Sequence, residues 1–249
     1  MDQFRLDGRR ALISGAGRGI GKAISISLAE AGAHVTLVAR SKAEIEAVSD
    51  DINANGGVAQ AFVLDVSDLS SVQAMIAQNG PFNILVNNAG MNRPAETLSV
   101  SIDDYDAIMG LNVRAPYFMS QAVAQGLIDA GQSGSIVNIS SQMGYVGSAG
   151  RSVYCASKHA MEGFTKAMAV EWGKHDIRVN TVCPTFIETP MTKPFFEDET
   201  FKEKVLSKIH LGRIGQVDDV TGAVIFLASD AASMITGSAL KVDGGWTAE

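Results

Sequence analysis

The sequence has 249 residues, enough to bury a sizeable apolar core, and its 46% hydrophobic and 19% charged residues are typical of a folded globular protein. A formal net charge of -7 argues against nucleic acid or an anionic membrane as a partner, because their phosphates attract clustered Lys and Arg. The sequence has only two cysteines and no apolar run near the roughly 18 residues of a membrane span, so we expect a cytoplasmic protein without a disulfide framework.

Short apolar runs alternate along the chain with longer stretches of helical periodicity. Runs rich in Val, Ile and Leu predict buried strands at residues 11–14, 35–39, 61–64, 84–86, 135–139, 178–183 and 239–242. Amphipathic stretches predict helices at residues 19–31, 42–55, 101–130, 152–174 and 217–229. This alternation indicates an α/β fold with a doubly wound parallel sheet and helices on both faces, in which ligands bind beyond the carboxyl ends of the strands.

The chain has no Pro- or Ser-rich linker and no repeat, so we expect a single domain over residues 1–249. Its main irregularity is residues 184–212, where proline and phenylalanine recur at Pro184, Phe186, Pro190, Pro194, Phe195 and Phe196. Long excursions of this kind are often functional, so we predict a substrate loop there. Neither the scattered histidines nor the cysteines have metal-ligand spacing, and no metal site is expected.

A glycine-rich segment joins the first predicted strand to the first predicted helix. Its candidate cofactor-binding residues are Ser14, Gly15, Gly17, Arg18, Gly19, Ile20 and Gly21. Glycines in such a turn let backbone N–H groups approach a pyrophosphate, and the helix N-terminus adds a positive dipole. A turn without a ligand is the structural alternative, but the position in the first strand-helix unit favours a dinucleotide.

Tyr154 and Lys158 are four residues apart and therefore lie on one face of the predicted helix at 152–174. Alone, this pair could be a helix anchor and a solvated lysine. It is accompanied by Ser141, just past a predicted strand, and by Asn112. A phenol near an ammonium group can act as a general acid/base, and a hydroxyl can hold a substrate oxygen.

These segments resemble the short-chain dehydrogenase/reductase family. Residues 14–21 are similar to its TGxxxGxG signature, with Ser14 in place of the usual Thr, and residues 87–90 match its Asn-Asn-Ala-Gly block. Together, Asn112, Ser141, Tyr154 and Lys158 match its Asn-Ser-Tyr-Lys tetrad, and the similarity continues to residues 242–246. The resemblance implies a Rossmann-like fold and an NAD(P)(H)-dependent oxidoreductase that interconverts a ketone and a secondary alcohol.

The resemblance also implies roles for individual residues. Tyr154 would be the general acid/base and Ser141 would hold the substrate oxygen. Lys158 would lower the Tyr154 pKa and hold the nicotinamide ribose, and Asn112 would steady Lys158 through water. Further cofactor contacts are implied for Asp65, Val66, Asn88, Ala89, Gly90, Ile187 and Thr189. One departure is Thr185, which stands where the family usually has Gly after Pro, so the backbone near the nicotinamide can take a different course.

The end of the second predicted strand bears on the choice of cofactor. NAD-binding units carry an acidic residue about 20 positions beyond the glycines, where it accepts hydrogen bonds from the ribose. Here Ala39 takes that place, Arg40 follows it, and Arg18 lies in the glycine turn. Two guanidinium groups could bind a 2′-phosphate, so we predict a preference for NADP(H), with NAD(H) as the weaker cofactor. The alternative is that both arginines are merely solvated.

Within the family, the pattern is most similar to 3-oxoacyl-carrier-protein reductases and to sugar-acid or polyol dehydrogenases. We expect a 3-oxoacyl reductase-like activity, with a sugar-acid or polyol dehydrogenase as the alternative. The substrate side is expected to include Asn92, Arg93, Gln142, Met143, Tyr145 and Phe186.

Two rival functions come from other classes. A dinucleotide-binding regulator without catalysis would keep this fold, but the complete tetrad argues against it. An epimerase or methyltransferase of similar fold predicts different companions for the glycines. The resemblance, together with small and apolar residues on the predicted helices at 101–130 and 152–174, also predicts a homo-oligomer, specifically a tetramer.

Overall fold

The computed structural model of the chain describes residues 2–190 and 192–249. Met1 and Met191, which fall within the predicted domain and, for Met191, within the predicted substrate loop, lie outside the described residues. In the described ranges no helix is both long enough and apolar enough to cross a membrane. The cytoplasmic location and the single-domain organisation stay predictions.

The centre of the molecule is a parallel sheet of seven strands in the order β3-β2-β1-β4-β5-β6-β7. The strands are β1 (Arg10–Ser14), β2 (His34–Ala39), β3 (Val58–Val63), β4 (Ile84–Asn87), β5 (Gly134–Ile139), β6 (Ile177–Pro184) and β7 (Ala239–Val242). Every residue of β4 and β5 is buried, as a sheet covered on both faces requires. The strand order reverses between β1 and β4, the place where such sheets bind ligands. The predicted doubly wound fold is confirmed.

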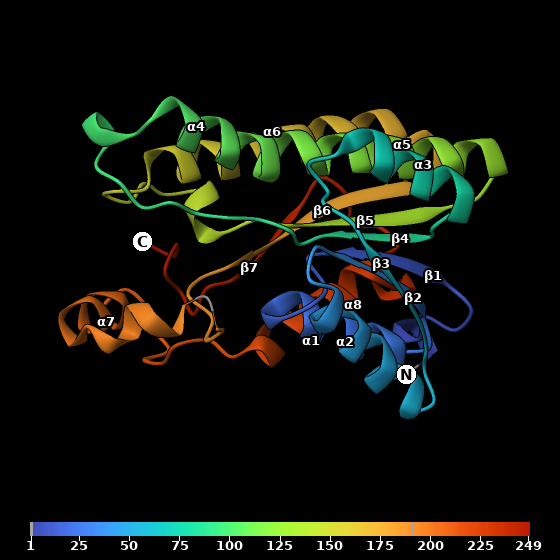
Figure 1. The fold of residues 1–249 in the computed structure, drawn as a ribbon, viewed down its shortest axis with the longest axis horizontal. Coiled ribbons are helices and arrows are strands. Elements are labelled where there is room, and N and C mark those ends of the chain that lie inside the picture. Colours follow the sequence, from blue (N-terminus) through green and yellow to red (C-terminus); the bar gives the residue numbers. More distant parts are fainter. Residues whose placement is uncertain (1, 191) are drawn as a thin grey trace.

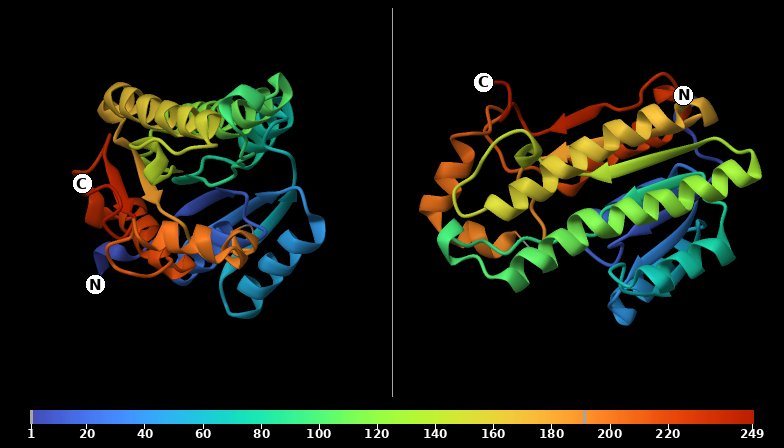
Figure 2. Two further views of the ribbon diagram at one scale, coloured as in Figure 1. Left: turned by 90° about the vertical axis from the view of Figure 1, so that its left-hand side faces the viewer. Right: turned by 90° about the horizontal axis from the view of Figure 1, so that it is seen from above.

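Helices cover both faces of this sheet (Figure 1). One layer contains α3 (Leu69–Asn79), α4 (Ile102–Met109), α5 (Ala115–Ala130) and α6 (Ser152–Trp172). The other contains α1 (Gly19–Glu30), α2 (Lys42–Ala54) and α8 (Val217–Ala228). Helices α5 and α6 run side by side along the outside of their layer, whereas α7 (Glu199–Leu206) lies at one end of the molecule (Figures 1 and 2).

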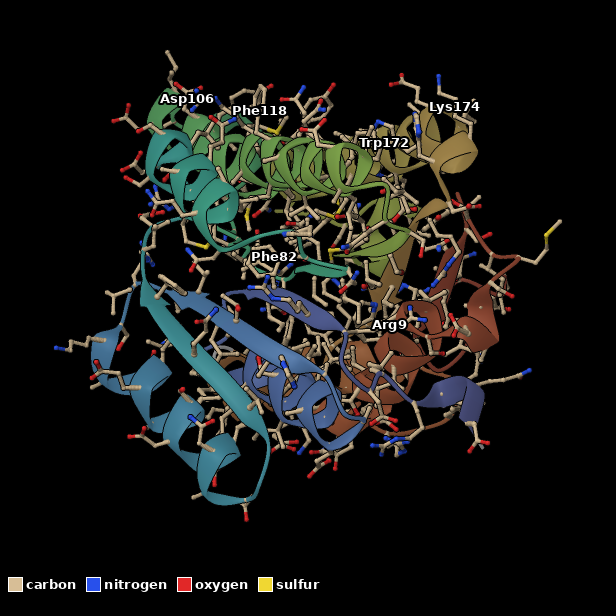
Figure 3. All side chains as sticks on the ribbon, turned by 90° about the vertical axis from the view of Figure 1, so that its right-hand side faces the viewer. Arg9, Phe82, Asp106, Phe118, Trp172 and Lys174 are labelled. Atoms are coloured by element: carbon tan, nitrogen blue, oxygen red, sulfur yellow. The ribbon has the colours of Figure 1, made fainter. Side chains whose placement is uncertain are left out.

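Each helical layer buries an apolar face against the sheet. Leu28 of α1 and Val224 of α8 belong to the core on one side. On the other side, Met119 of α5 and Met168 of α6 pack with Phe82, which lies between sheet and helices (Figure 3). Burial of these side chains fixes the strands, and with them the residues at the strand ends.

The predicted helix at 101–130 is interrupted. After α4, residues Gly110–Arg114 form a π-helical turn, and α5 begins only at Ala115. Pro116 lies in the first turn of α5, and because it has no backbone N–H it cannot continue the regular hydrogen-bond ladder. Asn112 belongs to this π turn and is fully buried.

The segment predicted as a substrate loop has structure of its own. It contains a 3₁₀ turn at Lys193–Glu197 and the helix α7, neither of which the sequence pattern predicted. Ile187 forms an isolated parallel bridge with Gly215, which ties the start of the segment to the residues before α8.

Candidate active site

A cavity of about 750 Å³ lies at the carboxyl end of the sheet. Most predicted site residues line it: Gly15, Gly17, Arg18, Gly19, Ile20, Gly21, Arg40, Asp65, Val66, Asn88, Ala89, Gly90, Asn92, Arg93, Ser141, Gln142, Met143, Tyr154, Lys158, Phe186, Ile187 and Thr189. Ser14, Asn112 and Tyr145 do not belong to its lining. One space therefore joins the glycine-rich turn to the predicted proton-transfer group.

The glycine-rich turn forms a cradle of bare backbone between β1 and α1. Gly15 and Gly19 have positive φ values of 65° and 54°, a conformation that favours glycine. A Cβ on Gly21 would overlap the Gly15 carbonyl oxygen, and a Cβ on Gly19 would lie 3.5 Å from the Thr189 side chain. Since α1 begins at Gly19, its N-terminal amides point toward this space, which fits a pyrophosphate.

Ser14 and Asn88 brace the cradle from within the protein. The Ser14 hydroxyl accepts hydrogen bonds from the backbone N–H groups of Asn88 and Ala89, at 3.0 and 3.1 Å. In return, the Asn88 amide donates to the carbonyl oxygens of Ser14 and Gly15, both at 3.1 Å. Ser14 keeps the hydroxyl of the Thr in the family signature, and this hydroxyl joins the turn after β1 to the turn after β4.

Arg18 and Arg40 lie at the end of the cavity next to β2. Arg18 is 3.7 Å from the Glu44 carboxylate and Arg40 is 3.8 Å from that of Asp65. Their side chains are 63% and 76% exposed, so these long ion pairs are weak. Both guanidinium groups can therefore turn toward an anion.

Tyr154 and Lys158 occupy the first turns of α6. Lys158 is only 4% exposed, and its ammonium group donates a 2.8 Å hydrogen bond to the carbonyl oxygen of Ile139, the last residue of β5. Burial lowers the Lys158 pKa to about 8, while Cys183 and Glu162 act in the opposite direction. The ammonium nitrogen lies 5.6 Å from the centre of the Tyr154 ring.

The surroundings of the Tyr154 phenol change its pKa in opposite directions. Burial raises its pKa, whereas a hydrogen bond with Ser141 and the charge of Arg151 lower it. Ser141 also donates to the Gln142 side chain at 2.6 Å and accepts from the Met143 N–H at 3.1 Å, so its orientation is fixed. The effect of Lys158 on the Tyr154 pKa stays a prediction.

Two predicted site residues act from behind the cavity wall. The Asn112 side chain accepts from the Met91 N–H and donates to the Met91 carbonyl, both at 2.9 Å, and to the Ser157 hydroxyl at 3.1 Å. It thereby fastens the segment after β4 to α6, and its link to Lys158 through water stays a prediction. Tyr145 donates from its hydroxyl to the buried Glu162 carboxylate at 2.6 Å.

Arg151, which the sequence motifs did not predict as a site residue, lines the cavity beside Tyr154. Its guanidinium lies 5.7 Å from the Phe186 ring and 5.8 Å from the Phe195 ring. A signal was present, because Arg151 precedes Tyr154 by one helical turn. Within the described part of the chain, no group of three or more His, Cys, Asp and Glu side chains could hold a metal ion.

A glycine cradle at the sheet's reversal point, with a Tyr-Lys pair in the same cavity, defines a dinucleotide-dependent oxidoreductase. Comparisons agree. Residues 15–247 match the family model described as enoyl-(acyl carrier protein) reductase. L-xylulose reductase of Bos taurus is 42% identical over 98% of this chain and 99% of its own. The 3-oxoacyl-[acyl-carrier-protein] reductase of Vibrio harveyi is 39% identical over 97% and 98%.

A solved structure is similar along its whole length. Gluconate 5-dehydrogenase of Burkholderia cenocepacia, in complex with NADP and tartrate, is 37% identical with a TM-score of 0.95, covering 100% of this chain and 98% of that one. Other relatives, 36 to 39% identical, are named as dehydrogenases of polyols or sugar acids. The chain belongs to the classical short-chain dehydrogenase/reductase family. It is an oxidoreductase that acts on CH–OH groups with NAD(P), as the sequence predicted.

Proposed function

We propose that the chain interconverts a ketone and a secondary alcohol in a small polyhydroxylated molecule, with NADP(H) as its preferred cofactor. The observation that carries the proposal is that Ser141, Tyr154 and Lys158 line the same cavity as the glycine cradle. The names of the polyol and sugar-acid relatives support this substrate class. The 3-oxoacyl reductase-like activity, favoured by the sequence motifs, becomes the second candidate, supported by the Vibrio harveyi relative.

The residues of the chain have distinct tasks in this reaction. The backbone of the glycine cradle would hold the pyrophosphate, and Lys158 would hold the nicotinamide ribose. When bound, the cofactor supplies or accepts the hydride. Ser141 orients the substrate oxygen, and the Tyr154 hydroxyl donates a proton to that oxygen in reduction or removes one in oxidation.

The decisive experiment is a panel of polyols, sugar acids, ketoses and 3-oxoacyl thioesters assayed with both nicotinamide cofactors, for the wild type and Tyr154→Phe. We expect the variant to lose turnover on every substrate, because general acid/base catalysis contributes roughly 10²- to 10⁴-fold in rate. Its cofactor affinity should stay within a few-fold, since little volume is removed. More than about a tenth of the activity in Tyr154→Phe would remove this residue from the proposed role.

The cofactor preference rests on Arg18 and Arg40. Each charge-assisted hydrogen bond to a 2′-phosphate contributes about 1.5 to 3 kcal/mol, which predicts at least a roughly tenfold preference for NADP(H) in kcat/KM. Arg40→Ala should reduce this preference, while Lys174→Ala, an exposed cation after α6, should not. Equal efficiencies of the two cofactors in the wild type would contradict the assignment.

We also infer that the chain forms a homo-oligomer, specifically a tetramer. Support comes from the outer surfaces of α5 and α6, where Tyr117 and Val170 are exposed. Both helices run side by side there, so a second copy could cover them together (Figure 2).

A further inference from the structure

Arg151 is a half-buried cation in the cavity wall, and no carboxylate of the described residues pairs with it. The other arginines of the wall differ in this respect. Arg93 lies 2.6 Å from the Asp104 carboxylate, and Arg18 and Arg40 have the long ion pairs given above. Burial also lowers the Arg151 pKa, and the groups that act in the opposite direction, Tyr154 and Cys155, are not carboxylates.

Two aromatic rings hold the Arg151 side chain in place. Phe186 and Phe195 both lie within 6 Å of its guanidinium, and both also line the cavity. Phe186 is held in turn by ring contacts with Phe201 at 5.6 Å and Trp246 at 5.9 Å. Aromatic faces orient a guanidinium without neutralising it, so its planar set of N–H donors is left free for an anion.

The position of this cation relative to the reacting groups defines what it can bind. Arg151 lies one helical turn before Tyr154, and its charge acts on the Tyr154 phenol. A substrate whose oxygen contacts Ser141 and Tyr154 can therefore place a second group, a few carbon atoms away, against Arg151. Carboxylates match the guanidinium in geometry and charge.

We propose that Arg151 binds the carboxylate of the substrate, so that the enzyme acts on a small oxo- or hydroxycarboxylic acid in preference to an uncharged ketose or polyol. This assignment rests on the proposed function, because it places the substrate in the same cavity. It also explains why an arginine stands at the start of α6 facing two aromatic rings. If Arg151 only fixed the segment after β6, its loss would lower kcat/KM for charged and uncharged substrates by the same factor.

The test compares kcat/KM for 5-oxogluconate and for the uncharged ketose fructose in the wild type, Arg151→Gln and Arg151→Lys. The effect of Arg151 on Tyr154 is common to both substrates and cancels in their ratio. We expect Arg151→Gln to lower the ratio of acid to ketose roughly 10- to 100-fold, the range of a lost charge-assisted hydrogen bond. Arg151→Lys should recover part of the ratio. The matched control is Lys174→Gln, at the opposite end of α6 (Figure 3), which should leave the ratio unchanged.

A binding measurement keeps this test independent of turnover. Calorimetric titration of gluconate into the wild type and Arg151→Gln, both with NADPH present so that no hydride can be accepted from gluconate, should show at least roughly tenfold weaker binding in the variant. Equal gluconate binding, or an unchanged acid-to-ketose ratio, would overturn the assignment of Arg151. A phosphorylated ketose with greater efficiency and the same dependence on Arg151 would also overturn it, in favour of a phosphate. If the wild type turns over no ketone or alcohol of the panel, the proposed function fails, and the gluconate titration still decides on Arg151.

Discussion

Lys158 places its charge in the cavity wall, where only 4% of the residue is exposed. Its ammonium group has one hydrogen bond, to the Ile139 carbonyl, and the Glu162 carboxylate acts on it only from a distance. The folded chain therefore holds the charged form of Lys158 less well than water does, and the pKa falls from 10.5 to about 8. A residue kept at this cost indicates a task other than stability.

Lys158→Met should stabilise the protein near pH 7 while abolishing activity. The difference between 10.5 and about 8 corresponds to roughly 3 kcal/mol, and loss of the hydrogen bond to Ile139 offsets about 1 kcal/mol, which leaves a gain of about 2 kcal/mol. Between pH 8 and 10.5 the unfolded wild type binds a proton that the folded one lacks, so its free energy of unfolding rises with pH.

The measurement is denaturant unfolding of both proteins at several pH values. The advantage of Lys158→Met should be fully present below pH 8 and should disappear by about pH 10.5. A variant less stable than the wild type at pH 7 would show that the buried charge is compensated.

The sequence was informative for residues whose chemistry depends on spacing along the chain. Tyr154 and Lys158 could be assigned because four residues in a helix define one face. Arg151 could not, since its importance comes from Phe186 and Phe195, which follow it by more than thirty positions and reach it only in the folded chain. Likewise, the use of Ser14 as a brace depends on a contact with Asn88, across two strands.

At the level of elements, a buried network of polar side chains joins the sheet to α5 and α6. Asn87 of β4 donates to Asn138 of β5 at 2.8 Å and to Ser120 of α5 at 3.0 Å. Asn138 in turn donates to the Thr165 hydroxyl of α6 at 2.8 Å. Since α6 carries Tyr154 and Lys158, these hydrogen bonds fix the catalytic helix over the strand ends.

Thr165→Val keeps the shape of this side chain but removes the acceptor for Asn138. We expect the protein to lose about 1 to 3 kcal/mol of unfolding free energy, because a buried amide donor is left without a partner. The same substitution at the exposed Thr97 should change stability by less than about 0.5 kcal/mol. Equal effects of Thr165→Val and Thr97→Val in denaturant unfolding would argue against a stabilising network.

Strong apolar patterns in the sequence made most helices and strands predictable. The helices that were not predicted have weak apolar patterns. Helix α3 buries only Val72, Met75 and Ile76, although Asp68 caps its first turn by accepting from the Ser71 N–H. Helix α7 buries only Val205, so it has almost no apolar stripe. The π turn in the predicted helix at 101–130 was marked only by Pro116. Local propensity and capping decide such elements, and periodicity does not reveal them.

For the molecule as a whole, the outer face of α5 and α6 combines exposed apolar side chains with a surface hollow. Val170 is 85% exposed there, and a hollow of about 230 Å³ lies between Tyr117, Phe164 and Trp172. Phe118 and Trp172 belong to this layer of helices (Figure 3), and Trp172 also packs against the core beneath it. Apolar groups gathered on one face are typical of an interface.

Light scattering should give a mass of about four times the 26.2 kDa chain for the wild type at micromolar concentration. Val170→Glu should yield a smaller assembly, since it places a charge in the proposed interface. Val58→Glu, at a position 51% exposed on the edge strand β3, is the matched control and should keep the wild-type mass. A wild type that is monomeric throughout would contradict the proposed tetramer.

Thr189 stands over the glycine cradle, because a Cβ on Gly19 would lie 3.5 Å from its side chain. Phe186, on the same segment, forms the wall beside Arg151. A dinucleotide in the cradle therefore supports the segment that encloses the second reactant. We therefore expect a compulsory order of binding, in which the nucleotide enters first and departs last, so that its oxidised and reduced forms should compete with each other for the empty enzyme.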